Sequence, residues 1–263
     1  MNHYQLHYAG FSCTGLVRRS NQDNFWCLGR SLPVVHGDEE VFSGIFIPEG
    51  KQWIAVFDGL GGEQQGEAAS GLAAKEFGRQ TPALSGRVFP KDAGEAMQEL
   101  CLAMNEEVCS YAAENKIQRM GTTAVGLCFD REAVFGFNVG DSRCFLYRDS
   151  AMTQLSTDHV VRSVLFRRRS LTQCIGMTDE VLPQPSVFER PYREADIYVL
   201  CSDGLTDMLS DEEIARVLSG TGSLEERLEM IREKVFEKGA ADNTTVFLIG
   251  VDRSVLSGQE ENP

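Results

Sequence analysis

Residues 53–62 read WIAVFDGLGG, an apolar run that ends abruptly at Asp58. The same arrangement recurs in IYVLCSDGL, which places Asp203 after an apolar run, and in AADNTTVFLIGV, which places Asp242 before one. A carboxylate at the end of a buried strand is costly unless it is paired or binds a cation. Oxygen ligands suit Mg²⁺ or Mn²⁺, whereas Zn²⁺ prefers His and Cys. The three aspartates therefore predict converging metal ligands and a metal-assisted reaction on phosphate.

The composition is that of an ordinary globular protein, with 42% hydrophobic and 24% charged residues over 263 positions. The formal net charge of −14 argues against nonspecific nucleic-acid binding, which is driven by a basic surface. No apolar run reaches the roughly 18 residues that indicate a membrane span, and the N-terminus lacks a signal-peptide pattern. We therefore expect a cytoplasmic protein that binds neither nucleic acid nor membrane.

The eight cysteines form no Cys-x-x-Cys pair, and several lie inside apolar runs such as VGLCF and YVLCSDG. In a chain without a secretion signal, this pattern predicts buried thiols and neither disulfides nor a zinc site. The chain has no long linker and no internal repeat, so we expect one domain over residues 1–253. A monomer is expected as a separate prediction, which the sequence itself does not support. The short polar stretch 254–263 is typical of a disordered tail.

Strand-like runs rich in β-branched and aromatic residues are dense along the chain. Three of them follow one another so closely that they predict an antiparallel meander, with Asp141 on the tight turn before the third. The predicted strands are 52–57, 122–129, 133–139, 143–148, 197–201 and 244–251.

Helical patterns occupy the intervals between these strands. Residues 63–80 favour a helix, and apolar residues recur at helical spacing over 97–111, after Asp92 and Glu95 in a capping-box pattern. Gly239 is a natural stop for the last helix. Two further capping-box pairs are Ser210 with Glu213 and Ser223 with Glu226. Grouped strands with helices between them predict an α+β fold, with helices packed on antiparallel sheets.

Eight motifs, in chain order, carry a family resemblance that covers about residues 10–251. The motifs are GLVRRSNQDNF, FDGLGG, GTTAVG, NVGDSR, LSTDH, LTQCIG, CSDGLTDML and DNTTVFLI. Each is weak alone, but the ordered set resembles the metal-dependent protein serine/threonine phosphatases (the PPM family, or type 2C phosphatases) of the bacterial type. The resemblance implies a sandwich of two antiparallel β-sheets flanked by pairs of antiparallel helices.

The resemblance also implies an activity, the hydrolysis of phosphoserine and phosphothreonine in proteins. Two Mn²⁺ or Mg²⁺ ions would hold a bridging water or hydroxide for direct attack on phosphorus. Asp58 would bridge both cations, the Gly59 carbonyl would bind one, and Asp203 and Asp242 would complete the site. Phosphorylated proteins would be the substrates, with Ser/Thr kinases acting in opposition. Taken alone, each aspartate is also compatible with an ordinary turn.

The N-terminal motif implies further roles. Asp23 matches an acidic position that binds metal directly or through water, although Gln22 stands beside it where many relatives have Glu. Arg18 occupies the phosphate-binding position, where a guanidinium can hold two phosphate oxygens. Arg19 competes for that role if the alignment slips by one residue. Asp141 matches a residue that helps to hold a weaker third metal ion.

Two departures from the family pattern bear on mechanism and substrate. Leu60 stands where some relatives have a His proposed as general acid, and leucine cannot transfer a proton. His159 is expected to organise a loop and not to replace that acid. The segment Arg162–Arg169 is short and basic where relatives have a longer flap. It either attracts an acidic or phosphorylated substrate or forms a solvated face.

Two rival functions stay open. The first is a noncatalytic module of the same family, against which the intact aspartates weigh because decayed sites typically lose ligands. The second is hydrolysis of a small phosphorylated metabolite, for which the chain shows no nucleotide-binding fingerprint. A thiolate mechanism is disfavoured because the sequence has no Cys-x5-Arg loop.

Overall fold

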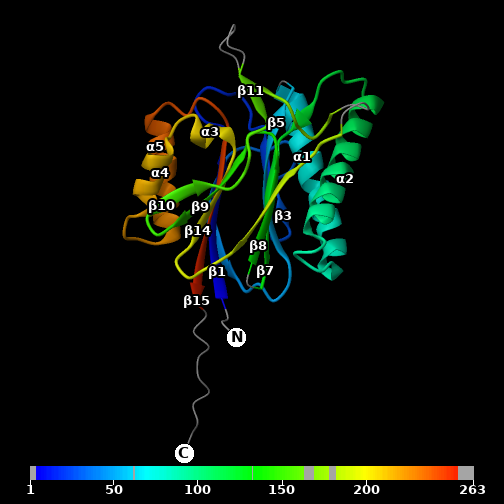
Figure 1. The fold of residues 1–263 in the computed structure, drawn as a ribbon. Helices are drawn as coiled ribbons and strands as arrows, with labels where there is room; N and C mark the ends of the chain where they lie inside the picture. The colour runs from blue at the N-terminus through cyan, green and yellow to red at the C-terminus, as the bar shows by residue number, and fades with distance from the viewer. Residues whose placement is uncertain (1–3, 62, 132, 163–168, 178–181, 254–263) are drawn as a thin grey trace, which may run out of the picture.

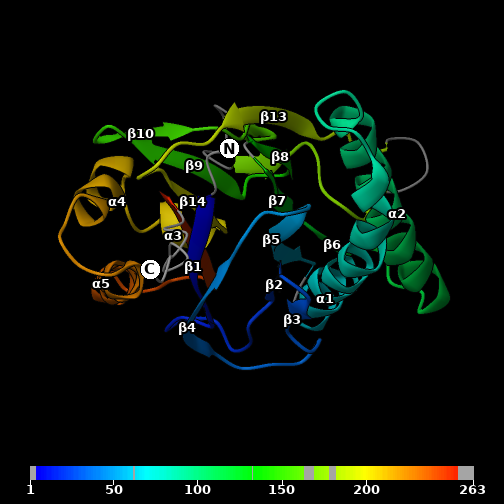
Figure 2. The same cartoon turned by 90° about the horizontal axis from the view of Figure 1, so that it is seen from below.

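The computed structural model describes residues 4–61, 63–131, 133–162, 169–177 and 182–253. The stretch 254–263 and the interior of the basic segment Arg162–Arg169 lie outside these residues. Two antiparallel sheets stand face to face, with helices on both outer faces, so that the layers run helix, sheet, sheet, helix (Figures 1 and 2). The predicted α+β sandwich with flanking helices is therefore confirmed.

The first sheet has the strand order β10-β9-β14-β15-β1-β4. Its strands are β10 (Ala151–Gln154), β9 (Arg143–Arg148), β14 (Ile197–Cys201), β15 (Thr244–Arg253), β1 (Tyr4–Cys13) and β4 (Glu39–Phe46). The second sheet has the order β13-β8-β7-β5-β2-β3, and a short strand β6 also pairs with β5. Its strands are β13 (Ser186–Pro191), β8 (Ala133–Val139), β7 (Ala124–Asp130), β5 (Gln52–Leu60), β2 (Asp23–Cys27), β3 (Arg30–Ser31) and β6 (Gly121–Thr122). A separate hairpin joins β11 (Val160–Arg162) to β12 (Arg169–Leu171).

The helices cover the two outer faces. Helix α1 lies on β5 and β2 and packs against α2, whereas α5 lies on β1 and β15 (Figure 2). The helices are α1 (Glu63–Gln80), a 3₁₀ turn η1 (Thr81–Gly86), α2 (Ala93–Glu114), α3 (Asp203–Thr206), α4 (Asp211–Leu218) and α5 (Leu224–Glu237). In the described part of the chain, no helix combines the length and apolar character that a membrane crossing requires.

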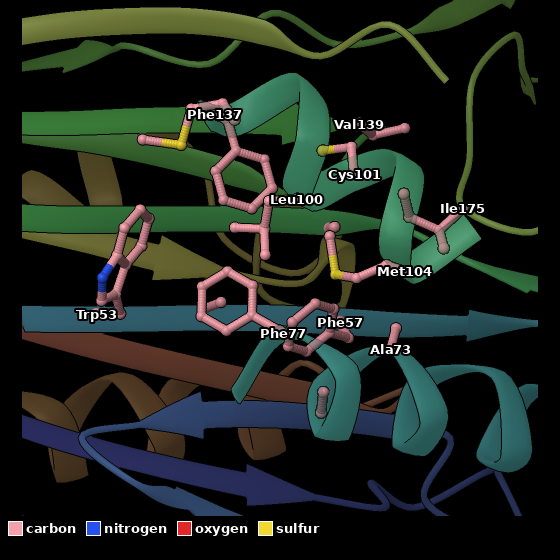
Figure 3. Close-up of a cluster of buried hydrophobic side chains, with 14 of the residues drawn as sticks. Trp53, Phe57, Ala73, Phe77, Leu100, Cys101, Met104, Phe137, Val139 and Ile175 are labelled. Carbon is pink, nitrogen blue, oxygen red and sulfur yellow. The ribbon is translucent and has the colours of Figure 1, made fainter. Parts of the chain in front are cut away.

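Apolar side chains fill the three spaces between the layers. Between the sheets, the rings of Phe25 and Phe247 meet edge to face at a centroid distance of 5.2 Å. Between the second sheet and its helices, Phe57 packs edge to face on Phe77 of α1 at 5.7 Å (Figure 3). Burial of each such side chain is worth about 1.5–3 kcal/mol. These cores hold the strands firmly, and therefore also the polar residues at the strand ends.

The predicted meander is wrong in its third strand. β7 and β8 form the expected hairpin, but β9 pairs with β14 and β10 in the other sheet. The free edge of β8 is taken by β13, and Gly140, with a φ of +105°, turns the chain away. A Cβ at Gly140 would also collide with Thr123. Asp141 therefore lies on the crossover between the sheets and not on a hairpin turn.

Two of the three predicted capping boxes are confirmed. Ser210 and Ser223 each accept a bond from the backbone three residues ahead, and each glutamate there bonds back to the serine N–H. The pattern at Asp92 does not form a capping box, because Asp92 has a φ of −97° and a ψ of 3° and not the extended N-cap conformation. Its carboxylate accepts the Val88 N–H at 3.0 Å instead.

The eight cysteines are free thiols, and six of them are fully buried. Burial raises their pKa values, to about 12 for Cys27 and Cys201, so these thiols stay protonated and unreactive at neutral pH. The prediction of buried cysteines is confirmed for these six, whereas Cys109 and Cys174 are half-buried.

Candidate metal centre

A cavity of about 1030 Å³ opens where the two sheets meet at the end of the sandwich that carries α3. Six of the seven predicted site residues line it, and Asp23, only 1% exposed, lies buried beside Asp58. The lining residues are Val17, Arg18, Arg19, Ser20, Gln22, Asp58, Gly59, Leu60, Gly61, Asp141, Leu171, Asp203, Asp207, Ala241, Asp242 and Asn243. Segments from the start, middle and end of the chain therefore meet in one cavity.

The sheets bring these carboxylates together from both sides. In the second sheet, Asp23 is the direct antiparallel partner of Asp58. In the first sheet, Asp203 follows β14 as the first residue of α3, and Asp242 precedes β15, the neighbour of β14. Because β14 and β15 are antiparallel, the last residue of β14 and the first residue of β15 lie at the same end of the sheet.

The backbone of Asp58 is held by the Gly-Thr-Thr motif. The carbonyl oxygen of Asp58 accepts from Thr123 N–H at 2.8 Å and from Thr122 Oγ1 at 2.9 Å. The N–H of Asp58 donates to Thr123 Oγ1 at 3.1 Å, and that hydroxyl is 2.6 Å from Ser142 Oγ on the crossover. The motif thus ties the strand that carries Asp58 to the segment that carries Asp141.

Asp23 is anchored by buried polar groups that join the two sheets. Ser202 Oγ donates to Asp23 Oδ2 at 2.7 Å and accepts from the Thr245 N–H at 3.0 Å. Thr245 Oγ1 lies 2.8 Å from Ser12 Oγ, which accepts from the Asn21 side-chain amide at 2.9 Å. All five residues are buried, so this network fixes the position of the Asp23 carboxylate.

The clustered carboxyls resist ionisation. Burial raises the pKa of Asp58 well above its usual 3.8, and repulsion from Asp23 and Asp203 adds to the rise. Burial raises the pKa of Asp203 to about 7, with Asp141 and Asp207 adding repulsion. Burial also raises the pKa of Asp23 to about 7. Such mutual destabilisation is what a bound cation would relieve.

The donor set fits hard divalent cations. Oδ1 of Asp23 is buried and accepts no hydrogen bond from the described residues, and the cavity wall supplies further carboxylates and no sulfur or imidazole. As they are placed, no three His, Cys, Asp or Glu side chains among the described residues surround a single ion position.

Arg18 is paired inside this cavity. Its Nη2 donates to Oδ2 of Asp242 at 2.5 Å, and this hydrogen bond is the main cause of a raised Arg18 pKa. The negative charges of Asp58 and Asp203 raise the Arg18 pKa further. Arg19, the alternative of the sequence analysis, lines the same cavity.

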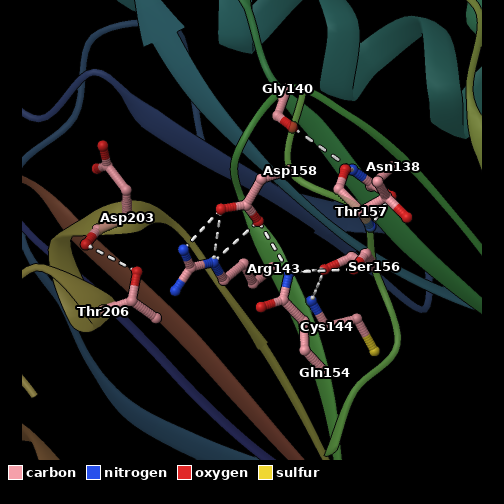
Figure 4. Close-up of polar contacts among 10 residues, drawn as sticks. All are labelled: Asn138, Gly140, Arg143, Cys144, Gln154, Ser156, Thr157, Asp158, Asp203 and Thr206. Atoms are coloured by element: carbon pink, nitrogen blue, oxygen red, sulfur yellow. Dashed lines mark hydrogen bonds and ion pairs between the residues drawn. The ribbon is translucent and has the colours of Figure 1, made fainter. Parts of the chain in front are cut away.

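The Ser-Thr-Asp-His segment, residues 156–159, clamps the crossover that carries Asp141; Figure 4 shows its first three residues beside Arg143. Arg143 makes a forked ion pair with Asp158, with its Nε and Nη2 at 2.9 and 2.6 Å from the carboxylate oxygens. The Gly140 N–H donates to His159 Nδ1 at 3.1 Å, and His159 Nε2 lies 2.9 Å from Ser186 Oγ. Since Nδ1 accepts, His159 is neutral with its proton on Nε2. His159 organises a loop, as predicted.

We expect His159→Phe to lower the free energy of unfolding by about 1–3 kcal/mol, because the Gly140 N–H loses its acceptor. His159→Asn should cost less, since its side-chain oxygen can replace Nδ1. Burial lowers the His159 pKa below its usual 6.5. The contribution of His159 to stability should therefore fall as pH drops below about 6.5, where the unfolded chain takes up a proton first. Chemical denaturation should show that the difference in unfolding free energy between the native protein and His159→Phe is smaller at pH 5.5 than at pH 8; an equal difference at both pH values would contradict this role.

The structure adds residues that the sequence analysis did not single out. Asp207 lines the cavity one helical turn after Asp203. Asn243 donates from one amide nitrogen to the carbonyls of Thr14 and Ser20, both at 2.9 Å. In the sequence, these two residues could have been found only by their positions, Asp207 four residues after Asp203 and Asn243 directly after Asp242. The partners of Asn243 lie more than 200 residues away in sequence, beyond the reach of local patterns.

Comparison with known proteins agrees with this geometry. A family model described as protein phosphatase 2C matches residues 42–243. The serine/threonine phosphatase stp of Listeria innocua is 28% identical over 251 residues, which cover 89% of this chain and 92% of that protein. The crystal structure of Mycobacterium tuberculosis PstP/Ppp superimposes with a TM-score of 0.74 at 26% identity, covering 95% of this chain and 100% of that one.

A second structure similar to this chain is that of the PstP catalytic domain in complex with two manganese ions. It superimposes with a TM-score of 0.73 at 26% identity, covering 95% of this chain and 99% of that one. The family model spans well over half of the present sequence, and the relatives named above align with 89% to 95% of it. The chain belongs to the protein phosphatase 2C family of serine/threonine phosphatases.

Proposed function

We propose that this chain removes phosphate from phosphoserine and phosphothreonine in proteins, with two Mn²⁺ or Mg²⁺ ions held in the cavity. The observation that carries the proposal is that Asp58, Asp203 and Asp242 line one cavity with an arginine at its wall, while Asp23 lies buried beside Asp58. Family membership supports the same activity. The cations would supply the positive charge that activates water and neutralises the phosphate oxygens.

The oxygen atoms of five aspartates and one glycine are proposed to bind the cations. Asp58, the Gly59 carbonyl, Asp203 and Asp242 would hold the two cations, with Asp23 behind them and Asp141 beside a third position. The three aspartates on the cavity wall, Asp58, Asp203 and Asp242, are half-buried, and the lower dielectric there strengthens each charge interaction relative to bulk water. The roles rest on their placement in the cavity and on the chemistry of their oxygens.

Arg18 would bind the phosphate of the substrate. It is now engaged by Asp242, and a cation on Asp242 would offset the charge that holds it. The planar guanidinium could then take two phosphate oxygens and stabilise the charge that develops on them. Lysine could not reproduce this forked contact.

Metal-bound water or another group at the cavity would have to protonate the leaving alkoxide. Leu60 lines the cavity at the position after Asp58-Gly59 and has no proton to transfer. His159 is occupied by Gly140 and Ser186 and does not line the cavity. An opposing Ser/Thr kinase, a monomeric state and a cytoplasmic location stay predictions.

The decisive experiment measures phosphate release from a phosphothreonine peptide, with the purified protein in excess EDTA, Mn²⁺ or Mg²⁺. We expect turnover that is absent in EDTA and restored by Mn²⁺ or Mg²⁺ but not by Ca²⁺, whose larger shell suits a tight carboxylate site poorly. Manganese binding without turnover would favour the noncatalytic module. Turnover of small phosphate esters alone would favour a metabolite substrate.

A further inference from the structure

A short loop, residues 15–19, projects beside the cavity and is here called the tongue. Its two ends are tied together by one side chain, since the Asn243 amide donates to Thr14 O and to Ser20 O. The Asn243 side-chain oxygen accepts the Gln22 N–H at 2.9 Å. The tongue is therefore fixed at its base by the residue that directly follows Asp242.

The first turn of the tongue is fixed as well. Gly15 has a φ of +78°, and a Cβ there would lie 2.5 Å from Ala240 O and 2.6 Å from Asp242 O. The next N–H, that of Leu16, donates to Ala240 O at 2.8 Å. Backbone held this closely has few alternative paths, so the tip of the tongue has a defined place beside the metal centre.

The tip presents an unusual set of side chains to solvent. Leu16 and Val17 are 64% and 68% exposed, although nothing in the local turn requires apolar residues there. Arg18 is paired with Asp242. Arg19 is exposed and lines the cavity, yet it forms no ion pair with any described residue. The tip therefore offers apolar surface and one uncommitted cation next to the proposed phosphate position.

We propose that the tongue selects substrates: Arg19 binds an acidic side chain adjacent to the phosphoresidue, while Leu16 and Val17 contact an apolar residue further along the same peptide. This inference rests on the proposed function and names a substrate class for it. The protein carries a net charge of −14, which by itself disfavours acidic peptides. A local cation is therefore needed to accept one, and exposed apolar groups beside a cation match an amphipathic segment.

The test uses three phosphothreonine peptides of equal length that differ only beside the phosphoresidue, where both neighbours are Asp, Ala or Lys. Initial rates with the Mn²⁺-loaded protein give kcat/KM for each peptide. We expect the Asp peptide to exceed the Ala peptide by about fivefold at low salt, a typical size for one exposed ion pair. The preference should shrink as ionic strength rises.

Variants assign this preference to residues. Arg19→Ala should bring the Asp:Ala ratio to about 1, and Arg19→Glu should invert it in favour of the Lys peptide. The matched control is Arg190→Ala, an exposed arginine on β13 outside the cavity lining, which should keep the ratio. Leu16→Ser should raise KM for peptides with an apolar residue two to four positions away, with little effect on kcat.

The outcomes separate this inference from the function on which it rests. Phosphopeptide turnover with an Asp:Ala ratio that Arg19→Ala leaves unchanged would overturn the tongue proposal alone. A Lys preference in the native protein would overturn it too, because the net charge and not Arg19 would then govern selection. An equal loss of kcat/KM on all three peptides in Arg19→Ala would show that Arg19 binds the phosphate itself. Failure to hydrolyse any phosphopeptide or p-nitrophenyl phosphate would instead contradict the proposed function.

Discussion

Asp203→Asn should reduce Mn²⁺-dependent phosphate release by about a thousandfold or more. The amide keeps the shape of the side chain but removes one of the charges that hold the cations, and electrostatic stabilisation of the phosphate is the largest catalytic contribution available here. The loss should appear in kcat, with the affinity for Mn²⁺ lowered in parallel. Isothermal titration with Mn²⁺ and steady-state kinetics measure the two effects separately.

The same substitution should leave the metal-free protein as stable as the native one, or more stable. The folded-state pKa of Asp203 is raised to about 7 from 3.8, so folding disfavours its ionised form. That penalty is absent at low pH, develops as pH rises above about 4, and is complete above about 7. Asn carries no such penalty. Thermal unfolding in EDTA at pH 7.5 should therefore show no loss of Tm in Asp203→Asn, and Mn²⁺ should raise the Tm of the native protein more.

Asp149→Asn is the matched control for charge. Asp149 is exposed at the turn between β9 and β10, with a φ of 52° that Asn also tolerates. Its activity and its response to Mn²⁺ should be those of the native protein. If Asp203→Asn kept most of the native turnover, the assignment of Asp203 to the metal centre would be wrong.

Gly59→Ala should abolish most activity and lower the free energy of unfolding by about 1–3 kcal/mol. A Cβ at this position would collide with Gly66 O and would lie 2.6 Å from Gln22 O. Both obstacles are backbone atoms, so β5 or α1 would have to move, and forced overpacking of this kind typically costs 1–3 kcal/mol. The movement would displace Asp58 and the carbonyl that is proposed to face a cation.

Gly94→Ala, in the first turn of α2, provides the control for this effect. No atom lies within 4 Å of a Cβ built there, and Ala is favoured over Gly in a helix by about 0.5–1 kcal/mol. We expect it to be neutral or slightly stabilising, with native activity. Urea denaturation and kcat/KM for both variants decide the matter: native stability and activity in Gly59→Ala would contradict the close approach of α1 to β5.

Local patterns were sufficient where the determining contacts are local. β14 has the predicted bounds, residues 197–201, and α1 occupies the predicted 63–80. The capping boxes at Ser210 and Ser223 formed because each joins groups only three residues apart. The pattern at Asp92 failed because the side chain found another local donor, the Val88 N–H.

Long-range pairing was beyond such patterns. β1 went unrecognised although it is an interior strand of the first sheet, between β15 and β4, and pairs with β15 some 240 residues later. β9 reads like the next strand of a hairpin series, yet it belongs to the other sheet because β13 occupies the edge of β8. Which strand pairs with the open edge of β8 depends on packing between distant parts of the chain.

The sequence by itself determined which aspartates end the core strands, because a carboxylate beside an apolar run is visible in the residue order. It also determined the family, through the order of eight motifs. Only the tertiary structure placed Asp23 opposite Asp58, joined Ser202, Thr245 and Ser12 beneath them, and set the tongue beside Asp242. The physical reason is that each of these contacts joins segments held in place by the packing of two sheets, which no local stretch encodes.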